Sequence, residues 1–390
     1  MLRFVTGGES HGKCLTGILE GLPSGLAVDV EFINNQLQRR QLGYGRGRRM
    51  DIENDRIEIT SGVRHGKTLG SPISFLLPNK DWEHWQIAMA AETVSEGADI
   101  KPVTCPRPGH GDLAGALKYQ THDARDVLER ASARETAARV AVGALCRLLL
   151  RHFDILIGSH VLAIGKVRVP AECEKLSLEA ILGIDPESPL RCAHAEVQKD
   201  MIEVIGASSK EGDTLGGIAE IVAGRVPPGL GSHCQWDFRL DGRLAQALMS
   251  IPAVKAVEIG NGVSAAQQPG SCVHDAIRYE EGTRRFIRES NNAGGLEAGM
   301  TNGEEVRARI YVKPIPTLRK PLMSVDLVSK EAVAAAFERS DTCVVPAAGV
   351  VGEAMLAIVL AQAFLEKFGG DSMRELEANY AGYLRALREF

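Results

Sequence analysis

Residues 132–151 read SARETAARVAVGALCRLLLR and residues 346–368 read PAAGVVGEAMLAIVLAQAFLEKF, and these two segments decide the fold. Each has the length and the apolar spacing of a helix rather than of a strand. Ser132, with Glu135 three positions later, predicts a capping box at the start of the first helix. Both segments are rich in Ala and Gly, so we expect both helices to pack closely against their neighbours.

The second segment has equally clear ends. Pro346 suits the first turn of a helix, and Gly369 and Gly370 suit the left-handed conformation that closes one. An arginine followed by small or polar residues precedes each segment, at Arg130 and at Arg339. This likeness suggests an internal duplication.

Shorter stretches between and after these helices have the composition of strands. They are residues 155–161, 218–226, 253–259 and 306–312. In the last of them apolar residues alternate with Arg307 and Arg309, which predicts a strand with one solvated face. No linker or repeat divides the chain, so the sequence predicts a mixed α/β class and one continuous domain, 1–390, with long ordered loops.

The composition is that of a folded globular protein, because 44% of the 390 residues are hydrophobic and 24% are charged. A formal net charge of −5 argues against a general nucleic-acid binder. The eight cysteines have no metal-ligand spacing, which favours reduced thiols and no metal site. Residues 1–10 lack the pattern of a signal peptide, and charged or polar residues with Pro and Gly interrupt the apolar run 344–364. We therefore expect a cytoplasmic protein with no membrane span.

Arginines and glycines gather between positions 39 and 49. The arginines are Arg39, Arg40, Arg46, Arg48 and Arg49. Guanidinium groups bind phosphate and carboxylate in pairs of hydrogen bonds, and glycines let the backbone approach an anion. A solvated loop is the plain alternative. A nucleic-acid contact is a weaker one, since Tyr44 is the only stacking aromatic there.

Two histidines have glycine neighbours, His11 in GESHG and His110 in RPGHGD. Such a ring reaches a ligand easily and titrates near neutrality, although a lone histidine is more often structural. No P-loop and no clear dinucleotide-binding GxGxxG unit occurs. The expected helix start near Ser132 offers free N–H groups to a phosphate, with Arg130 and Arg134 supplying charge.

Two further segments place polar groups beside regular elements. Residues 313–317, KPIPT, directly follow the expected strand 306–312 and put a lysine and a hydroxyl at its end, or simply form a turn. Asp341 is either a catalytic carboxylate or the cap of the helix that follows it.

Together these segments resemble the chorismate synthase family, in order along nearly the whole chain. The stretches are GESHG (8–12), RRQLGYGRGRRMDIE (39–53), RPGHGD (107–112), RASARET (130–136), KAVEIG (255–260), NNAGGLEAGMTNG (291–303), KPIPT (313–317) and RSDTCVV (339–345). The resemblance implies a βαβ sandwich with internal pseudo-twofold symmetry, and a homotetramer. It implies 5-enolpyruvylshikimate 3-phosphate as substrate, reduced FMN as cofactor, NADPH as the possible reductant, and a 1,4-trans elimination without net redox change.

The resemblance also implies roles for particular residues. FMN contacts would be Arg130, Ala131, Ser132, Pro252, Ala253, Ala298, Lys313, Pro314, Ile315, Pro316, Thr317 and Arg339. NADPH or substrate contacts would be Arg40, Arg46, Arg49, Arg107 and Arg134. His11 would protonate the departing phosphate, His110 would manage the proton on the flavin, and Asp341 would help the flavin accept the ring proton.

Three positions depart from the family pattern, each by exchange of one small residue for another. Gly111 stands where alanine is usual, Ala131 where serine is usual, and Ala298 where glycine is frequent. The loss of the hydroxyl at Ala131 leaves only backbone binding there.

Two other functions remain open at this point. A flavin reductase would need FMN and an anion pocket and would consume NADPH stoichiometrically. An RNA-binding protein using the 39–49 loop would lose affinity steeply with salt.

Overall fold

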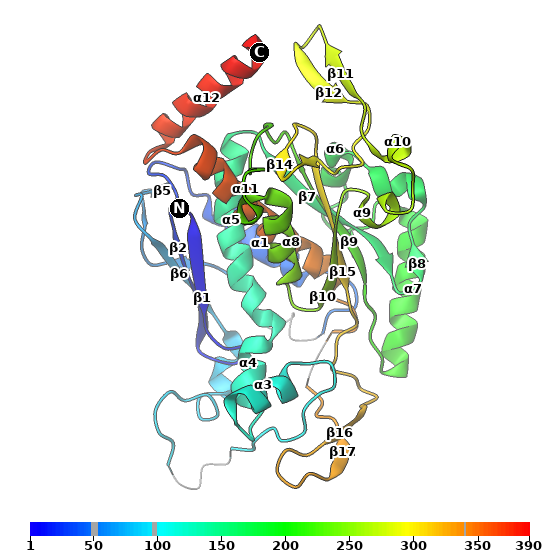
Figure 1. Cartoon of the computed structure of the whole chain (residues 1–390). Coiled ribbons are helices and arrows are strands. Elements are labelled where there is room, and N and C mark those ends of the chain that lie inside the picture. Colours follow the sequence, from blue (N-terminus) through cyan, green and yellow to red (C-terminus); the bar gives the residue numbers. More distant parts are fainter. Residues whose placement is uncertain (48–53, 96–99, 339–340) are drawn as a thin grey trace.

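The computed structural model describes residues 1–47, 54–95, 100–338 and 341–390, and in it two antiparallel sheets enclose a layer of helices (Figure 1). The first sheet has the order β1 (Arg3–Gly7), β2 (Cys14–Glu20), β6 (Ile73–Pro78), β3 (Glu58–Ile59). The second has the order β10 (Val254–Ile259), β15 (Val306–Val312), β9 (Gly217–Gly224), β7 (Leu156–Ile164), β8 (Val167–Arg168).

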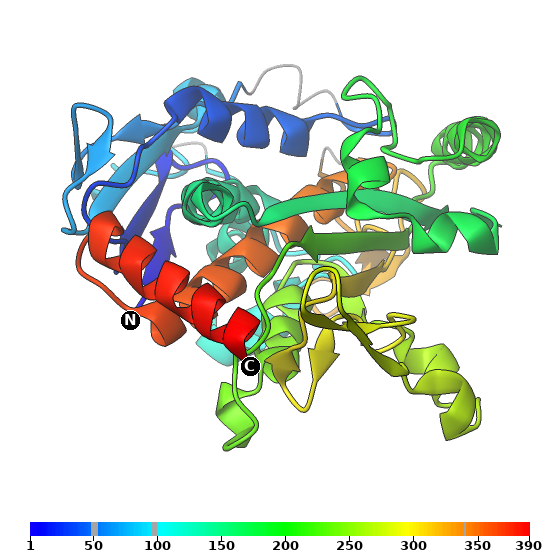
Figure 2. The same cartoon turned by 90° about the horizontal axis from the view of Figure 1, so that it is seen from above.

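The helical layer contains the two segments that the sequence singled out. They form α5 (Thr136–His152) and α11 (Val345–Phe368), which pack on each other, on α1 (Val30–Gln41) and on the five-stranded sheet (Figure 2). Helix α5 also contacts the four-stranded sheet, and α8 (Leu240–Met249) lies against α11 and β10. The predicted βαβ sandwich is therefore confirmed, while its twofold symmetry stays a prediction.

The remaining elements surround this sandwich. Its other helices are α3 (Asp112–Tyr119), α4 (Arg125–Ala131), α6 (Leu178–Leu182), α7 (Ala195–Glu211), α9 (Gly262–Ala265), α10 (Gly270–Val273) and α12 (Met373–Glu389). Two-stranded hairpins pair β4 (Val63–Arg64) with β5 (Lys67–Thr68), β11 (Ile277–Glu280) with β12 (Arg285–Arg288), β13 (Leu296–Glu297) with β14 (Met300–Thr301), and β16 (Met323–Val325) with β17 (Ala332–Ala334).

A glycine explains how closely the two central helices cross. A Cβ added at Gly143 of α5 would lie 2.3 Å from the Cβ of Ala354 in α11, too close for any larger residue. Helix α11 is long and apolar enough to span a membrane, but 89% of its most apolar window is buried inside the protein. It is a core helix, as the sequence indicated.

The four predicted strands occur within a few residues of their expected bounds, as β7, β9, β10 and β15. Two details of the prediction were wrong. Ser132 accepts a hydrogen bond from the N–H of Arg134, and Glu135 pairs with Arg139, so the reciprocal capping box does not form. A 3-10 turn (Ala133–Glu135) precedes α5 instead.

The second error concerns the face of β15 that carries Arg307 and Arg309. This face is covered rather than solvated, and Arg309 is only 9% exposed. Both guanidinium groups bind Glu220 of the neighbouring strand β9 at 3.0 Å. Ion pairing across the ladder allows arginines to alternate in a covered strand, which the sequence pattern alone does not reveal.

Candidate functional site

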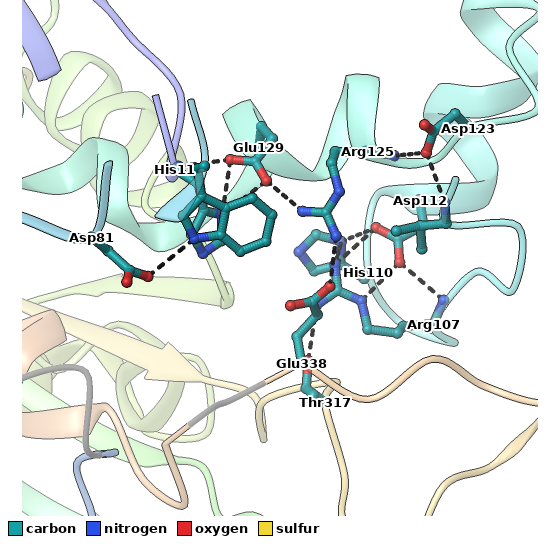
Figure 3. Close-up of polar contacts among 12 residues, drawn as sticks. His11, Asp81, Arg107, His110, Asp112, Asp123, Arg125, Glu129, Thr317 and Glu338 are labelled. Atoms are coloured by element: carbon teal, nitrogen blue, oxygen red, sulfur yellow. Dashed lines mark hydrogen bonds and ion pairs between the residues drawn. The ribbon is translucent and has the colours of Figure 1, made fainter. Parts of the chain in front are cut away.

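The first part of the site is formed by His11, in the turn between β1 and β2. Its Nδ1 lies 2.9 Å from a carboxylate oxygen of Glu129 in α4, and its backbone N–H donates to the other oxygen at 2.8 Å (Figure 3). The carboxylate accepts the Nδ1 proton and so holds the ring in one tautomer. The ring also stacks on Trp85, with 4.1 Å between centroids.

A cation holds the carboxylate of this pair. Arg125 donates to Glu129 at 2.8 Å and to Glu338 at 3.2 Å, and its guanidinium lies over the ring of Trp85. Trp85 donates its indole N–H to Asp81 at 3.2 Å. The orientation of His11 is thus fixed on one face of its ring, by Trp85, and at Nδ1, by Glu129.

The second part of the site has the same construction. His110 directs Nδ1 at a carboxylate oxygen of Asp112, a fully buried residue at the start of α3. Arg107 donates to Asp112 from its backbone at 3.0 Å and from its side chain at 2.8 Å and 3.1 Å. His110 therefore also belongs to a histidine–carboxylate pair and is held at Nδ1.

Both carboxylates stay ionised. Burial alone would raise the pKa of Glu129 and of Asp112, but hydrogen bonds outweigh burial and lower the pKa of each. For Glu129 the hydrogen bonds come first from His11, and for Asp112 from His110 and Arg107. An ionised partner holds each imidazole in one tautomer and stabilises it when it carries a second proton.

The two pairs belong to one structural unit. Asp112 opens α3 and Glu129 lies in α4, and these helices pack through Gly115, where an added Cβ would come within 2.2 Å of Val127. Figure 3 draws both pairs together with their arginines.

The loop 107–112 contacts two other predicted segments. Lys313 donates its amine to the carbonyl of Gly109, and Arg107 donates to the hydroxyl of Thr317 at 3.1 Å. On its other side, a Cβ added at Gly111 would lie 3.5 Å from the Cβ of Ala131. Residues from three distant parts of the sequence thus meet at one loop. The predicted contacts Pro314, Ile315 and Pro316 lie within the segment so anchored.

Residues 130–132 also hold the His11 turn. Arg130 donates to the carbonyl oxygens of Thr6 and Gly8, at 3.0 Å and 3.2 Å. The hydroxyl of Ser132 lies 3.1 Å from that of Ser10. The segment 130–132 and the His11 turn are therefore neighbours in the fold.

Arg40 and Arg134 are two buried arginines that share a carboxylate. Both lie within reach of Asp55, Arg134 at 2.7 Å and Arg40 at 3.7 Å. Burial lowers the pKa of Arg40 to about 10. Arg134 also donates to Asn79, whose amide donates to the carbonyl of Gly12 at 2.7 Å. Through Asn79, Arg134 supports the turn that carries His11.

Arg46 and Asp341 form an ion pair at 2.7 Å, and the N–H of Gly47 donates to the other oxygen of Asp341 at 2.6 Å. Helix α11 begins with Val344 as its cap and has no side-chain capping bond. Of the two readings of Asp341, the helix cap is therefore wrong. Arg39 and Arg40 end helix α1 instead of belonging to the glycine-rich loop, and Arg39 binds Glu353.

The predicted flavin contacts are not all in one place. Ala253 accepts a hydrogen bond from the N–H of Lys313 at 2.9 Å, so the Pro252–Ala253 stretch adjoins the site. Ala298 lies in the β13–β14 turn, at the opposite end of β15 (Figure 1). Seven strand residues separate the two ends, roughly 20 Å. Arg49 and Arg339 fall outside the described residues.

Sequence reasoning missed several contributors: Trp85, Arg125, Glu129 and Glu338. Asp112 appeared within a motif, but without a role. Glu129 precedes the motif RASARET directly, yet a single glutamate carries no pattern of its own. In the described residues, no group of three His, Cys, Asp or Glu side chains is arranged to hold a metal ion.

The comparisons with known proteins agree with this geometry. The family model described as chorismate synthase matches residues 2–365. A chorismate synthase from Solibacter usitatus (strain Ellin6076) is 54% identical over 390 residues and covers the whole of both chains. The chain belongs to the chorismate synthase family. It is accordingly a carbon–oxygen lyase of the shikimate pathway.

More distant sources give the same result. A chorismate synthase from Aquifex aeolicus (strain VF5) is 52% identical over 395 residues, which is all of this chain and 99% of the relative. A solved structure, a crystal structure of chorismate synthase, superposes with a TM-score of 0.80 at 44% identity and covers 100% of this chain and 99% of that one. The mixed α/β fold predicted from the sequence is therefore also that of a solved relative.

The exchange at Gly111 leads to a stability prediction. Gly111 has helical backbone angles (φ −73°, ψ −4°), and the added Cβ meets Ala131 at an ordinary contact distance of 3.5 Å. Gly111→Ala should therefore raise the free energy of unfolding by about 0.4–1 kcal/mol, because alanine restricts the unfolded chain. Urea titration measures the change. A loss of stability would show that the loop does not hold this conformation in solution.

Proposed function

We propose that the chain catalyses the 1,4-trans elimination of phosphate from 5-enolpyruvylshikimate 3-phosphate, giving chorismate. The observation that carries the proposal is the presence of two histidine–carboxylate pairs on the packed helices α3 and α4, with arginines close by. An elimination of this kind must protonate a leaving phosphate and remove a ring proton. Two imidazoles, each held at Nδ1 by its own carboxylate, suit those two tasks.

The arginines give the site its anion chemistry. The substrate carries one phosphate and two carboxylates, and guanidinium groups bind such groups in pairs of hydrogen bonds. Arg46 holds Asp341, itself a proposed proton-handling residue, and Arg107 holds Asp112, the partner of His110. Arg40 and Arg134 are almost completely buried, so their proposed part is to add positive charge. Arg134 would also position the His11 turn through Asn79.

Reduced FMN is the proposed cofactor, and the residues present fit it. Lys313 lies near Lys255, and burial, followed by that second charge, lowers the pKa of Lys313. Among the described residues neither lysine has a carboxylate partner, and Arg130 binds only Thr6 and Gly8. Unneutralised cations beside Thr317 and Ser132 would hold the cofactor's phosphate.

When bound, reduced FMN supplies electron density that helps the carbon–oxygen bond to break and recovers it afterwards, without net redox change. His11 would donate a proton from Nε2 to the leaving phosphate while Glu129 stabilises the ring. His110 would hold or move a proton at Nε2, kept in place by Asp112. Asp341 is the third proposed proton-handling group, with Arg46 bound to it.

An anaerobic assay tests this function. Chemically reduced FMN and 5-enolpyruvylshikimate 3-phosphate are added without NADPH, and phosphate release and chorismate absorbance are followed together. Equal amounts of both products support the proposal. No product, with flavin bound and NADPH consumed without organic substrate, would instead support a flavin reductase.

The proposed assembly, compartment and reductant are those that the family resemblance implies. We propose a homotetramer in the cytoplasm, with NADPH as a reductant for the flavin. Light scattering measures the assembly, and NADPH oxidation with oxidised FMN under anaerobic conditions tests the reductant.

A further inference from the structure

A groove runs between helix α7 and the glycine-rich segment 44–47. It consists of two adjoining hollows, of ≈ 190 Å³ and ≈ 20 Å³, which share Ser209, Arg319 and Thr342.

The groove adjoins the site already described. Its smaller hollow is lined by Thr317 and Asp341. The hydroxyl of Thr317 accepts a hydrogen bond from Arg107, and Asp341 pairs with Arg46. A ligand in the groove would therefore contact residues that hold the arginines of the site.

The backbone around Arg319 is fixed from both sides. The N–H of Lys320 donates to the carbonyl of Gly212 at 3.2 Å, and the hydroxyl of Thr214 donates to the carbonyl of Ile315 at 2.8 Å. Gly212 closes α7 with φ +76°, and a Cβ there would lie 3.1 Å from the Cβ of Arg319. The arginine thus stands on a rigid support at the end of a helix.

Among the described residues Arg319 forms no salt bridge, although the carboxylate of Asp213 lines the same hollow. The side chain of Arg319 is exposed, and it makes no hydrogen bond or ion pair with any other described residue. Arg46 and Asp341 neutralise each other at 2.7 Å. Asp213, the other carboxylate of the groove, accepts a hydrogen bond from the N–H of Thr214 at 2.8 Å.

The groove also carries side-chain hydroxyls. They belong to Tyr44, Ser209, Thr214, Thr317 and Thr342. The hydroxyl of Thr214 already donates to Ile315, so the hydroxyls of Ser209 and Thr342, which line both hollows, are the ones beside Arg319. A guanidinium with two donors in one plane, next to such hydroxyls, is a chemistry that matches a phosphate group. A carboxylate ligand would use fewer of these donors, because it has two oxygens where phosphate offers three or four.

We propose that Arg319 binds a phosphate group in this groove and so forms an anion subsite beside the Arg46–Asp341 pair. The identity of the natural ligand rests on the proposed function. The phosphate is either the one released by the elimination or a phosphate of NADPH, and both present the same chemistry to Arg319.

Titration calorimetry with inorganic phosphate tests the subsite on the full chain. Arg319→Ala should weaken phosphate binding about tenfold, the effect of losing one charge-assisted contact. The phosphate affinity of Arg319→Lys should lie between those of the wild type and Arg319→Ala, because lysine keeps the charge but not the paired donors. Lys320→Ala removes a neighbouring exposed cation and should leave affinity unchanged.

A second titration, with NADPH, distinguishes the two sources. If Arg319→Ala loses affinity for inorganic phosphate only, the groove binds the released product. If it loses affinity for NADPH to the same extent, the groove binds the nucleotide. Unchanged affinity for both ligands in Arg319→Ala, with an unchanged unfolding temperature, would overturn the proposal. These titrations measure binding and need no turnover, so their results can be interpreted even if the assay detects no chorismate.

Discussion

His110→Ala should lower kcat by about 10²–10⁴-fold, the usual contribution of a positioned proton-transfer group. The pair that His110 forms with Asp112 holds its ring for such a transfer, and Arg107 keeps that carboxylate ionised. The substitution removes only a half-buried side chain, so flavin binding and the unfolding temperature should stay close to those of the wild type. Stopped assays with chemically reduced FMN measure the rate.

Two comparisons make the result specific. Asp112→Asn leaves the ring in place but removes the charge that fixes its tautomer, so it should lower kcat and change the pH–rate profile. His122→Ala removes an exposed histidine from the loop between α3 and α4 and should have no effect. Wild-type turnover in His110→Ala would remove this residue from the mechanism.

The sandwich could be predicted because its central helices are marked by composition. Ala and Gly in 132–151 and 346–368 fit the close crossing at Gly143 and Ala354, and Pro346 and Gly369 define the ends of the second helix. Strands 155–161 and 306–312 had enough β-branched residues to be found. Their order in the sheet was not readable, because antiparallel pairing of β15 with β9 and β10 joins segments far apart in sequence.

The site could be predicted as a set of motifs but not as a geometry. The segments with His11, His110 and Lys313 were found separately, and only tertiary contacts show that the loop 107–112 joins them. Glu129 was missed because a carboxylate becomes a partner of His11 through the packing of α4, not through a spacing in the chain. Likewise, nothing in the pattern of Arg307 and Arg309 indicates that Glu220 covers them.

A buried ion cluster leads to the largest expected effect on stability. Glu353 of α11 is fully buried and binds Arg39 at 2.7 Å, Arg147 at 2.5 Å and the hydroxyl of Ser159 at 2.7 Å. Arg191 lies close enough to add to the positive charge. Glu353→Gln should lower the free energy of unfolding by about 3–5 kcal/mol, because it leaves buried guanidinium groups without their counter-charge.

Two variants test whether charge, rather than packing, causes the loss. Glu366→Gln changes another glutamate of α11, one that pairs with Arg243 at the surface, and should cost at most about 1 kcal/mol. Arg147→Leu added to Glu353→Leu should restore part of the stability lost in Glu353→Leu alone, since it removes one uncompensated charge. Urea unfolding of each variant gives the energies. A loss in Glu366→Gln equal to that in Glu353→Gln would contradict the assignment.

The charge of Glu353 also predicts how the free energy of unfolding depends on pH. Burial alone would raise the pKa of Glu353, but the charges of Arg39 and Arg147 outweigh it, so the folded pKa lies below the ordinary value of 4.5. The unfolded chain therefore binds more protons near pH 4, and the stabilisation is fully present above the unfolded pKa and lost as pH falls through the folded pKa. The stability gap between wild type and Glu353→Gln should be constant at neutral pH and narrow below about pH 4.5. A gap that stays the same down to pH 3 would mean that Glu353 stabilises the core by shape and hydrogen bonding, because its charge would then contribute nothing.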